Sequence, residues 1–497
     1  MCYDIYGDDM KNKLNKMFGI TKNNSSIKVE VFAGIATFLA TAYILIANPN
    51  NLLMNGTMDP RWASVFIATA LGAAIGTFLM GLYAKMPLVQ APGMGINALV
   101  GGIIGGTIGI AYSFGNAMLL VFISGIVFLL LSYIKVGKEK IALRELIFDG
   151  MPKALRDAIS VGIGLFIAFI GLKNAGIING NDFTLVELVK FNNPDLWVSG
   201  GTALKAVVAL FGLFVICILS HYKIKGSVIF GILSATILAI PLGVADLDIL
   251  LGKTSDVTWN AFESFKTFFS FNPESGGTFL SVFTEGFNFP AGSLFTSIIL
   301  VVSLSMVDMF DTMGTVLACT TNADLNDEDG KPLNYGKIMK SDSLATVIGS
   351  TLGTATVTTM VESGAGVAEG GKTGLTAVTT GVLFILSIFL LPLFAFIPSA
   401  AAASALIYVG VLMMKNIVNV DLTNIKNAVP AFLTIILMPL TYSITDGIGV
   451  GIISYTFINL IIYLIDRIKG KKEKLNLNIV TVIVTILFLI YFLVPMI

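Results

Sequence analysis

Acidic side chains stand in apolar surroundings at two places in this chain. The stretch VESGAGVAEGGKTGLTAV holds Glu362 and Glu369, seven positions apart among small residues. The stretch LVVSLSMVDMFDTMGTVLA holds Asp308 and Asp311, one helical turn apart. A carboxylate can accept hydrogen bonds from a polar ligand, and away from water it can take up and release a proton. These residue types therefore predict a site where a small polar ligand and a coupled ion meet.

The surroundings of these acids are those of a membrane protein. Of the 497 residues, 55% are hydrophobic and only 12% are charged, and the mean hydropathy is +0.86, whereas a soluble domain carries about 25% charged residues. A charge at the bilayer centre costs at least about 2.5–3.5 kcal/mol, so Asp308 and Asp311 require water, partners or protonation. A structural pair bonded to serine and threonine is the alternative. The formal net charge of zero offers no basic field for nucleic acid.

Apolar runs of about 20 residues, each long enough to cross a bilayer core of roughly 30 Å, predict fourteen spans and a possible fifteenth. They lie at about 29–48, 62–84, 89–111, 116–135, 154–172, 201–219, 226–244, 293–318, 340–353, 356–374, 375–397, 400–416, 427–445, 447–466 and 477–496. Lysine and arginine favour the cytoplasmic side of short loops. With a cytoplasmic N-terminus, all basic residues fall inside except Arg61, Lys173, Lys190, Lys205, Lys253 and Lys266. The long outside segments 173–200 and 246–290 read as surface loops or short amphipathic helices.

Two glycine-rich segments predict helices that are interrupted within the membrane. In LVQAPGMGINALVGG, Pro92 lacks an N–H and suits the first turn of a helix, so we expect a break near 90–93 and then a half-helix with Asn97 one turn in. A glycine-rich packing surface is the alternative. The match of GMGINA to a dinucleotide fingerprint is rejected, because that motif needs a βαβ unit in water.

The second glycine-rich segment repeats the pattern. TATVTTM can be extended, and Glu362 then begins a helix, where the dipole favours a carboxylate. The two segments stand third and tenth, seven spans apart, so a repeat would be inverted across the membrane. Transporters place their substrate between such interrupted helices. PKALRDAISVG (152–162) and PSAAAASALIYVG (398–410) echo each other in the same way.

Other candidates have simpler explanations. Thr37, Thr41 and Tyr43 could face the same cavity or bond to neighbouring helices. His221 reads as a loop residue, so a proton relay would rest on aspartate and glutamate. The acidic loop 322–337 reads as a solvated turn, because its glycine falls one place late for a calcium loop. The sequence predicts no metal site.

Four stretches together resemble a known family. TFLATAYILIANP, APGMGINAL, VDMFDTMGT and ESGAGVAEGGKTGLTAV are similar to motifs of the AzgA-like adenine/guanine/hypoxanthine permeases, within the nucleobase–cation symporter-2 (xanthine/uracil permease) superfamily. The resemblance covers about residues 20–497. It implies an all-α polytopic protein of fourteen spans in two inverted repeats of seven, a homodimer, and an elevator-like movement of a core domain against a gate domain. The span at 477–496 goes beyond this common plan and would place the C-terminus outside.

The implied domains follow the order of the spans. They are a cytoplasmic N-terminal tail (1–27), core spans 1–4 (28–136), gate spans 5–7 (137–245), an extracellular segment (246–290), core spans 8–11 (291–398), gate spans 12–14 (399–468) and a C-terminal segment (469–497). In the family the substrate lies between the half-helices of spans three and ten, against span eight.

The motif matches assign roles to particular residues. Substrate binding is expected of Asn97, Asp308, Asp311, Glu362, Ser363, Gly364, Tyr43 and Phe310. Proton coupling is expected of Asp308, Asp311 and Glu369, although Glu369 could equally be a carboxylate at a helix end near water. The half-helix backbone is expected to be shaped by Pro92, Gly93 and Gly95.

The resemblance implies a symporter that imports adenine, guanine or hypoxanthine through the cytoplasmic membrane with a proton. Sodium is left open as the coupling ion, and no resident cofactor, metal or nucleic-acid partner is expected. Two other classes remain. An anion transporter of the same architecture would want a basic residue at the half-helix ends. An intramembrane enzyme would use Asp308 and Asp311 as an acid pair, but the chain holds no HExxH or GxGD sequence.

Overall fold

The computed structural model describes most of the chain, and it is mostly helical. The described residues are 11–53, 59–106, 110–136, 141–142, 144, 151–181, 184–224, 226–251, 259–271, 275–328, 331–470 and 477–493. Within these ranges nine helices are long and apolar enough to cross a membrane, and shorter apolar helices accompany them.

Each predicted span of the first half coincides with regular structure. The elements are α2 (Ile27–Thr41), α3 (Ile44–Leu52), α4 (Trp62–Phe78) with its π-helical extension η3 (Leu79–Ala84), β1 (Gln90–Pro92), α5 (Met94–Ile104), α6 (Phe114–Tyr133), α8 (Lys153–Asn174), α9 (Thr202–His221) and α10 (Ser227–Ala239). The first span is broken at Ala42 and Tyr43, between α2 and α3.

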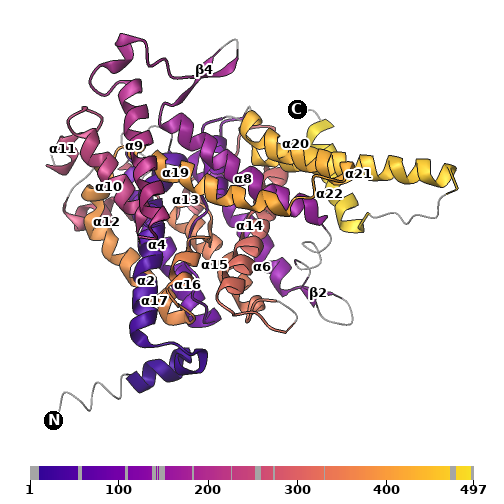
Figure 1. Cartoon of the computed structure of the whole chain (residues 1–497), viewed down its shortest axis with the longest axis horizontal. Coiled ribbons are helices and arrows are strands. Elements are labelled where there is room, and N and C mark those ends of the chain that lie inside the picture. The colour runs from indigo at the N-terminus through magenta and orange to yellow at the C-terminus, as the bar shows by residue number, and fades with distance from the viewer. Residues whose placement is uncertain are drawn as a thin grey trace.

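The second half repeats this order. Its elements are α14 (Leu294–Asn322), α15 (Tyr335–Leu352), β6 (Val357–Thr359), α16 (Ser363–Ala368), α17 (Gly374–Ser387), α18 (Leu391–Ala395), α19 (Ser399–Met414), α20 (Ile425–Thr441), α21 (Ile444–Ile468) and α22 (Ile479–Leu493). The last helix occupies the predicted fifteenth span. Figure 1 shows α2 and α4 upright in the view, whereas α21 runs nearly horizontally across it.

The two interrupted spans meet at their extended segments. β1 pairs antiparallel with β6, with Gln90 opposite Thr359 and Pro92 opposite Val357. Both strands are fully buried, and backbone that is irregular at membrane depth survives only inside protein or along a cavity. The predicted breaks are therefore confirmed. One detail differs, because Pro92 closes the strand and α5 begins only at Met94, with Gly93 as its N-cap.

The similar segments 152–162 and 398–410 also correspond to each other in the structure. Pro152 precedes α8 and Pro398 precedes α19 as the N-cap residue. The two helices pack closely at small residues, since a Cβ on Gly410 would lie 2.5 Å from the Gly164 carbonyl oxygen. The related helices of the two repeats thus form one joint unit.

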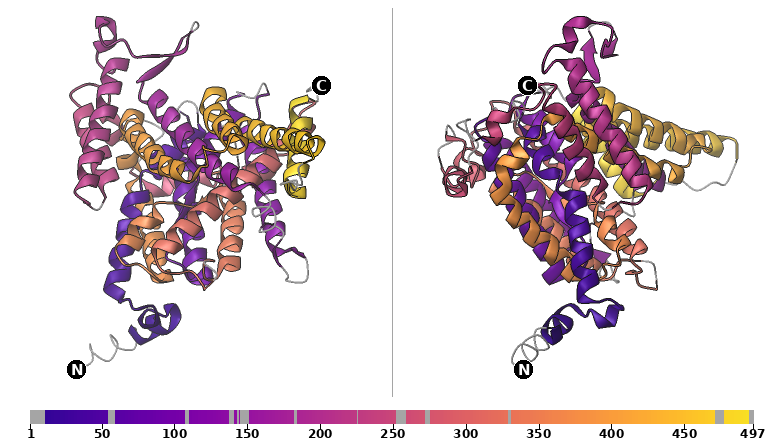
Figure 2. Two further views of the ribbon diagram at one scale, coloured as in Figure 1. Left: turned by 45° about the vertical axis from the view of Figure 1, so that its right-hand side comes forward. Right: turned by 60° about the vertical axis from the view of Figure 1, so that its left-hand side comes forward.

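The two ends of the molecule carry the segments that were predicted for opposite sides of the membrane. Figures 1 and 2 show the helical residues 11–18 at the bottom and the β4–β5 hairpin (Ile178–Asn181 and Leu185–Leu188) at the top. The hairpin was not predicted, because 173–200 read only as loop or short helix. Its antiparallel register joins Ile178 to Leu188 across a short turn, and much of it is exposed.

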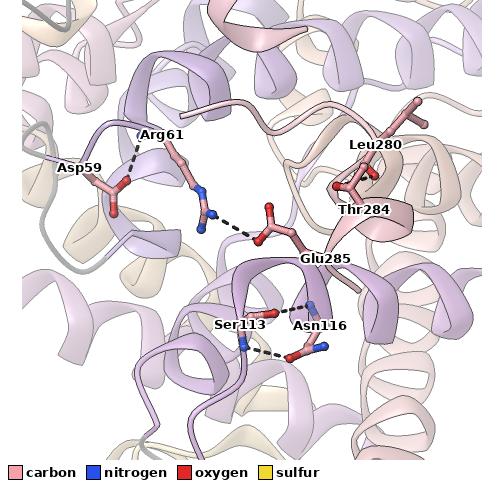
Figure 3. Close-up of polar contacts among 7 residues, drawn as sticks. All are labelled: Asp59, Arg61, Ser113, Asn116, Leu280, Thr284 and Glu285. Atoms are coloured by element: carbon pink, nitrogen blue, oxygen red, sulfur yellow. Dashed lines mark hydrogen bonds and ion pairs between the residues drawn. The ribbon is translucent and has the colours of Figure 1, made fainter. Parts of the chain in front are cut away.

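Short helices of the second outside segment cover the same end of the bundle. They are α11 (Leu247–Leu250), α12 (Ala261–Phe268) and α13 (Ser281–Thr284). Figure 3 shows how Glu285, just after α13, is held by Arg61, whose guanidinium lies 3.3 Å from the Glu285 carboxylate. Arg61 also lies 4.9 Å above the ring centre of Phe114, at the start of α6. This ion pair fixes the segment to the ends of α4 and α6.

Candidate functional site

A pocket of about 400 Å³, including open space at its mouth, lies between the predicted core and gate domains. The core side contributes Tyr43, Gly93, Met94, Gly95, Asp311, Thr315, Thr359, Met360, Val361 and Glu362. The gate side contributes Ile163, Ile167, Val409 and Met413. The polar side chains of the pocket thus all belong to the core side, whereas the gate side contributes only apolar residues.

Glu362 presents one carboxylate oxygen that is bonded and one that is not. The Tyr43 hydroxyl donates to Oε1 of Glu362 at 2.8 Å, and both side chains are buried. Oε2 of Glu362 has no hydrogen-bond partner in the described part of the protein. A buried carboxylate oxygen without a donor is costly, so this atom is poised to accept an N–H from a ligand.

Asp311 and Asp308 occupy different places although they share one turn of α14. Asp311 is half-buried and lines the pocket together with Thr315, one turn further along. Asp308 is buried behind the wall, where Oδ2 accepts from the Thr346 hydroxyl of α15 at 3.0 Å. Oδ1 of Asp308 has no partner among the described atoms. The helix therefore shows one acid to the pocket and the other to the interior.

A further buried carboxylate, Asp342 of α15, holds the strand pair in place. Its Oδ1 accepts from the Thr359 N–H at 2.8 Å, the Thr359 hydroxyl at 2.7 Å and the Gln90 side-chain amide at 3.0 Å. Its Oδ2 accepts from the Thr312 hydroxyl of α14 at 2.7 Å. Asp311 is close enough to Asp342 and Glu362 to interact with both electrostatically. Asp342 thus links α14, α15, β1 and β6 just behind the pocket.

Asn97 belongs to a second polar network on the other side of β6. Its side-chain amide donates to Asn48 at 2.7 Å and to the Thr354 carbonyl at 3.2 Å. Its carbonyl oxygen accepts from the Thr356 hydroxyl at 2.6 Å and the Thr356 N–H at 3.2 Å. Asn97 therefore satisfies the backbone of the extended segment that leads to β6.

Another buried carboxylate, that of Glu30 in α2, fixes the far end of the α16 segment. It accepts from the backbone N–H groups of Lys372 and Thr373 at 3.1 Å each and from the Thr376 hydroxyl at 2.6 Å. A carboxylate at the start of α17 is favoured by the helix dipole. Close packing of α2 against α16 at Gly366 completes the support of the half-helix that Glu362 precedes.

The arrangement is that of known transporters. The transmembrane domain of the bicarbonate transporter BicA of a cyanobacterium matches with a TM-score of 0.55 at 16% identity, over 84% of this chain and 97% of that chain. The structure of SLC26A9 matches with a TM-score of 0.56 at 12% identity, over 92% and 70%. This likeness confirms the predicted helical membrane fold of two inverted repeats, whereas the count of fourteen spans stays a prediction.

Sequence comparison places the chain among permeases. A model of the permease family matches residues 28–450. The chain belongs to this permease family. It is 36% identical to adenine permease AdeP of Escherichia coli, over 96% of this chain and 95% of the relative. It is 34% identical to guanine/hypoxanthine permease PbuG of Bacillus subtilis, over 89% and 93%. The permease is thus a multi-pass membrane transporter and not an enzyme, which removes the acid-pair enzyme considered from the sequence.

The pocket of the permease brings together some of the predicted site residues and leaves others outside. Tyr43, Gly93, Gly95, Asp311 and Glu362 line it. Residues behind or beyond the lining are Asp308, Asn97, Pro92, Ser363, Gly364 and Glu369.

Three of the outlying residues, Ser363, Gly364 and Glu369, belong to the α16 segment. The Ser363 hydroxyl accepts from the Val89 N–H at 3.0 Å and donates to the Met360 carbonyl at 2.6 Å. It thus joins the residue before β1 to the residue after β6. Gly364 faces open space, and Glu369 is half-buried at the end of α16. Phe310 is part of α14, but its side chain lies outside the described residues.

Of the first-span hydroxyls, those of Thr37 and Thr41 lie outside the pocket lining, unlike that of Tyr43. Thr37 donates to the Ala33 carbonyl at 3.0 Å, and Thr41 donates to the Thr37 carbonyl, both within α2. His221 is exposed at the end of α9, as predicted. Among the described residues no cluster of metal-ligating side chains is found.

Asp342 is the functional candidate that sequence reasoning missed. The predicted ninth span began at Lys340, so Asp342 stood at its edge, where a charge costs little. In the permease α15 begins at Tyr335, and Asp342 lies about two turns inside the helix, fully buried. An acid within an apolar run, the same observation that singled out Asp308, could have found it.

Proposed function

We propose that the permease is a secondary active symporter that imports the purine nucleobases adenine, guanine and hypoxanthine through the cytoplasmic membrane with protons. The observation that carries the proposal is the unpartnered Oε2 of Glu362 in a pocket between core and gate. The relatives AdeP, an adenine permease, and PbuG, a guanine/hypoxanthine permease, support the same class of substrate.

The chemistry of the pocket suits a planar base with N–H groups on its edge. Tyr43 occupies Oε1 of Glu362 and so orients Oε2 toward a ligand donor. Asp311 and Thr315 offer further polar atoms from α14. The apolar residues Ile163 and Met413 of the gate contribute contact area for the ring faces, which carry no strong hydrogen-bonding groups.

Coupling to a proton is assigned to the acids of α14. Asp308 is buried and has a carboxylate oxygen without a partner among the described atoms, and a proton there removes the cost of an unpaired buried charge. Asp311 faces the ligand and interacts with both Asp342 and Glu362. Glu369, which ends α16 outside the pocket lining, remains a third candidate.

An elevator movement of core against gate fits the division of the pocket. The polar lining belongs to the core, so the core can carry a bound base past the apolar gate wall without breaking polar contacts to that wall. Hydrogen bonds across this boundary include that from the Asn174 amide of α8 to the Asn51 side-chain oxygen of α3, at 3.3 Å, and that from the Arg144 guanidinium to the Ser132 hydroxyl, at 2.7 Å. We also propose a cytoplasmic N-terminus, from the distribution of lysine and arginine, and a homodimer, from the family resemblance.

Uptake of radiolabelled adenine, guanine and hypoxanthine by a transport-deficient host tests the function. Proton and sodium gradients are imposed separately, and accumulation that follows the proton gradient alone is expected. Glu362→Ala should abolish uptake at normal membrane abundance. Glu187→Ala, which removes a carboxylate from the β4–β5 hairpin, is the matched control and should transport normally. Normal uptake by Glu362→Ala would overturn the site.

Cross-linking tests the movement. Asn51 and Asn174 face each other across core and gate. In an Asn51→Cys/Asn174→Cys variant, oxidation should join the two domains in one position and stop uptake, and a reductant should restore uptake. Unimpaired uptake by the fully cross-linked protein would contradict the elevator.

An anion transporter is the second candidate, because the structural neighbour BicA is a bicarbonate transporter. None of the described residues that line the pocket is basic, whereas an anion would require a cation or several donors. Competition of bicarbonate and chloride with labelled adenine distinguishes the two: displacement at millimolar concentrations would favour the anion class.

A further inference from the structure

Positive charge gathers in the first described segment, outside the bundle. Residues 11–18 are helical and lead through η1 (Thr21–Asn23) into α2. Lys16, Lys22 and Lys28 are exposed, and in the described part of the chain none of the three forms an ion pair. The sequence from residue 11 to residue 29 holds no aspartate or glutamate. We call Lys16, Lys22 and Lys28 the basic surface.

The basic surface is anchored to the bundle. Phe18 and Ile20 are buried in a small cluster with Leu375 of α17, and Leu14 and Val378 pack against its rim. Gly19 turns the chain there with a φ of 65°, a conformation that glycine adopts without strain. The segment therefore moves with α2 and α17 as one body. Figures 1 and 2 show it below the bundle, next to the lower ends of these helices.

The exposed side chains of α2 indicate where the membrane surface lies along this helix. Phe32 is 64% exposed, and Ile35 on the same helix is 36% exposed, so this face of α2 contacts lipid tails. Lys28 lies four residues before Phe32, which is about 6 Å along the helix axis. Lys28 is thus at headgroup level, and Lys16 and Lys22 follow in a segment folded back against α17. Met17, 49% exposed beside Lys16, adds an apolar side chain at this level.

We propose that the basic surface binds anionic lipid headgroups of the cytoplasmic leaflet. The recognised chemistry is a phosphodiester anion, which the three ammonium groups attract without a shaped pocket. One lysine close to an anionic leaflet contributes about 1 kcal/mol, which is roughly a fivefold preference. Three of them correspond to about a hundredfold if their contributions add. The location on the cytoplasmic leaflet rests on the proposed orientation.

Lipid binding here would also act on transport. The basic surface is fixed to α2 and α17, which belong to the core, so a movement of the core carries these lysines toward or away from the headgroups. Anionic lipid would then favour the position in which they meet. This consequence rests on the proposed elevator movement, whereas the binding itself does not.

The binding is tested without any substrate. The full chain, with serine at Cys2, Cys217 and Cys319, receives a spin label at Asn12→Cys or at Met17→Cys. It is placed in nanodiscs of phosphatidylcholine, with or without phosphatidylglycerol. We expect phosphatidylglycerol to lower the accessibility of either label to a water-soluble nickel chelate, and salt to reverse this.

Charge-matched variants decide whether the basic surface is responsible. The variant Lys16→Gln/Lys22→Gln/Lys28→Gln should lose the lipid-dependent change, with about a hundredfold weaker preference for phosphatidylglycerol. The control Lys190→Gln/Lys205→Gln/Lys266→Gln, which removes the same charge from exposed positions of the outside segments, should keep it. Equal accessibility in both lipids at both label positions would overturn the proposal, and so would a change that persists in the first variant.

A transport measurement separates this proposal from the function. Adenine uptake into vesicles with and without phosphatidylglycerol should differ for the wild-type chain and not for the Lys16→Gln/Lys22→Gln/Lys28→Gln variant. Absence of uptake in every lipid would refute the purine function and leave the label result standing. Equal uptake of the wild type in both lipids would refute the effect on transport.

Discussion

The bond between Tyr43 and Glu362 permits a prediction whose magnitude follows from the structure. Tyr43→Phe removes one hydroxyl and keeps the buried ring, which packs where the first span breaks between α2 and α3. The lost bond, 2.8 Å long, is made to a carboxylate, and such a bond contributes about 1.5–3 kcal/mol. Both oxygens of Glu362 would then lack a protein partner, and the side chain would no longer be held toward the pocket.

The expected loss is about ten- to hundredfold in the affinity for adenine, since 1.36 kcal/mol corresponds to a factor of ten. The loss should appear in Kd and in the KM of uptake, because the bond orients the ligand-binding atom. Combined with Glu362→Gln, the change should add little, because the two residues act as one unit. Scintillation proximity binding of labelled adenine to purified protein measures the affinities of the single and double variants.

A second buried tyrosine provides the matched control. The Tyr112 hydroxyl lies 3.2 Å from the Ser297 hydroxyl, away from the pocket lining. Tyr112→Phe makes the same chemical change and should leave Kd within about twofold, well inside the smallest effect expected from loss of a charged hydrogen bond. Equal affinities of Tyr43→Phe and the wild type, with Glu362→Ala inactive, would show that the Tyr43 bond does not prepare Glu362 for the ligand.

Three further predictions follow from the surroundings of the pocket. Gly366→Ala puts a Cβ 2.1 Å from a hydroxyl of α2 and should displace α16 and abolish uptake, whereas Gly336→Ala meets open space and should be neutral. Asp342→Asn turns an N–H group toward N–H and hydroxyl donors. The free energy of unfolding in detergent should therefore fall by about 3 kcal/mol, and uptake should be lost. Hydrogen bonds, led by that of Thr423, lower the pKa of the Asp421 carboxyl to about 2, so its stabilising charge is present above the ordinary carboxyl pKa and is lost only as the pH falls toward 2. Asp421→Asn should therefore leave the pH profile of uptake between about 5 and 8 unchanged.

The elements of this fold were largely predictable because their causes are local. Runs of apolar residues predict the spans, and the placement of lysine and arginine predicts on which side of the membrane each loop lies. Pro92 and the β-branched stretch before Met360 oppose helix at two symmetric places, so the breaks could be located to within a few residues. Glu362 at the start of a half-helix was predictable for the same reason.

The site was less predictable because it depends on pairings between distant segments. Asp308 and Asp311 stand one turn apart, and only the packing of α15 shows that the first faces the interior and the second the pocket. Asn97 has the right type and depth for a ligand contact, but its bonds are taken by Asn48 and Thr356. The β4–β5 hairpin lies in a polar segment whose alternation is too short to stand out.

Thr359 offers a physical route from the pocket to Asp342, the buried acid on α15 that is bonded to α14, which carries the proposed coupling acids. It lines the pocket, and its N–H and hydroxyl both donate to Asp342. A change in the charge or bonding of Asp342 would therefore reach the pocket through Thr359. Thr359 ends the strand β6, which leads to Glu362. Coupling between two sites requires a structural element that both sites share.

Thr359→Val keeps the shape and the backbone bond but removes the hydroxyl, at a cost of about 1–3 kcal/mol. Exchange of labelled for unlabelled adenine, which needs no proton gradient, should persist, while accumulation driven by a proton gradient should fall at least tenfold. Thr315→Val, which alters the pocket at a residue without a recorded bond to Asp342, should affect exchange and accumulation alike. If both variants lost the two activities in the same proportion, the acids behind the strand pair would have no special part in coupling, because the ligand would be sensing only the polarity of its own pocket.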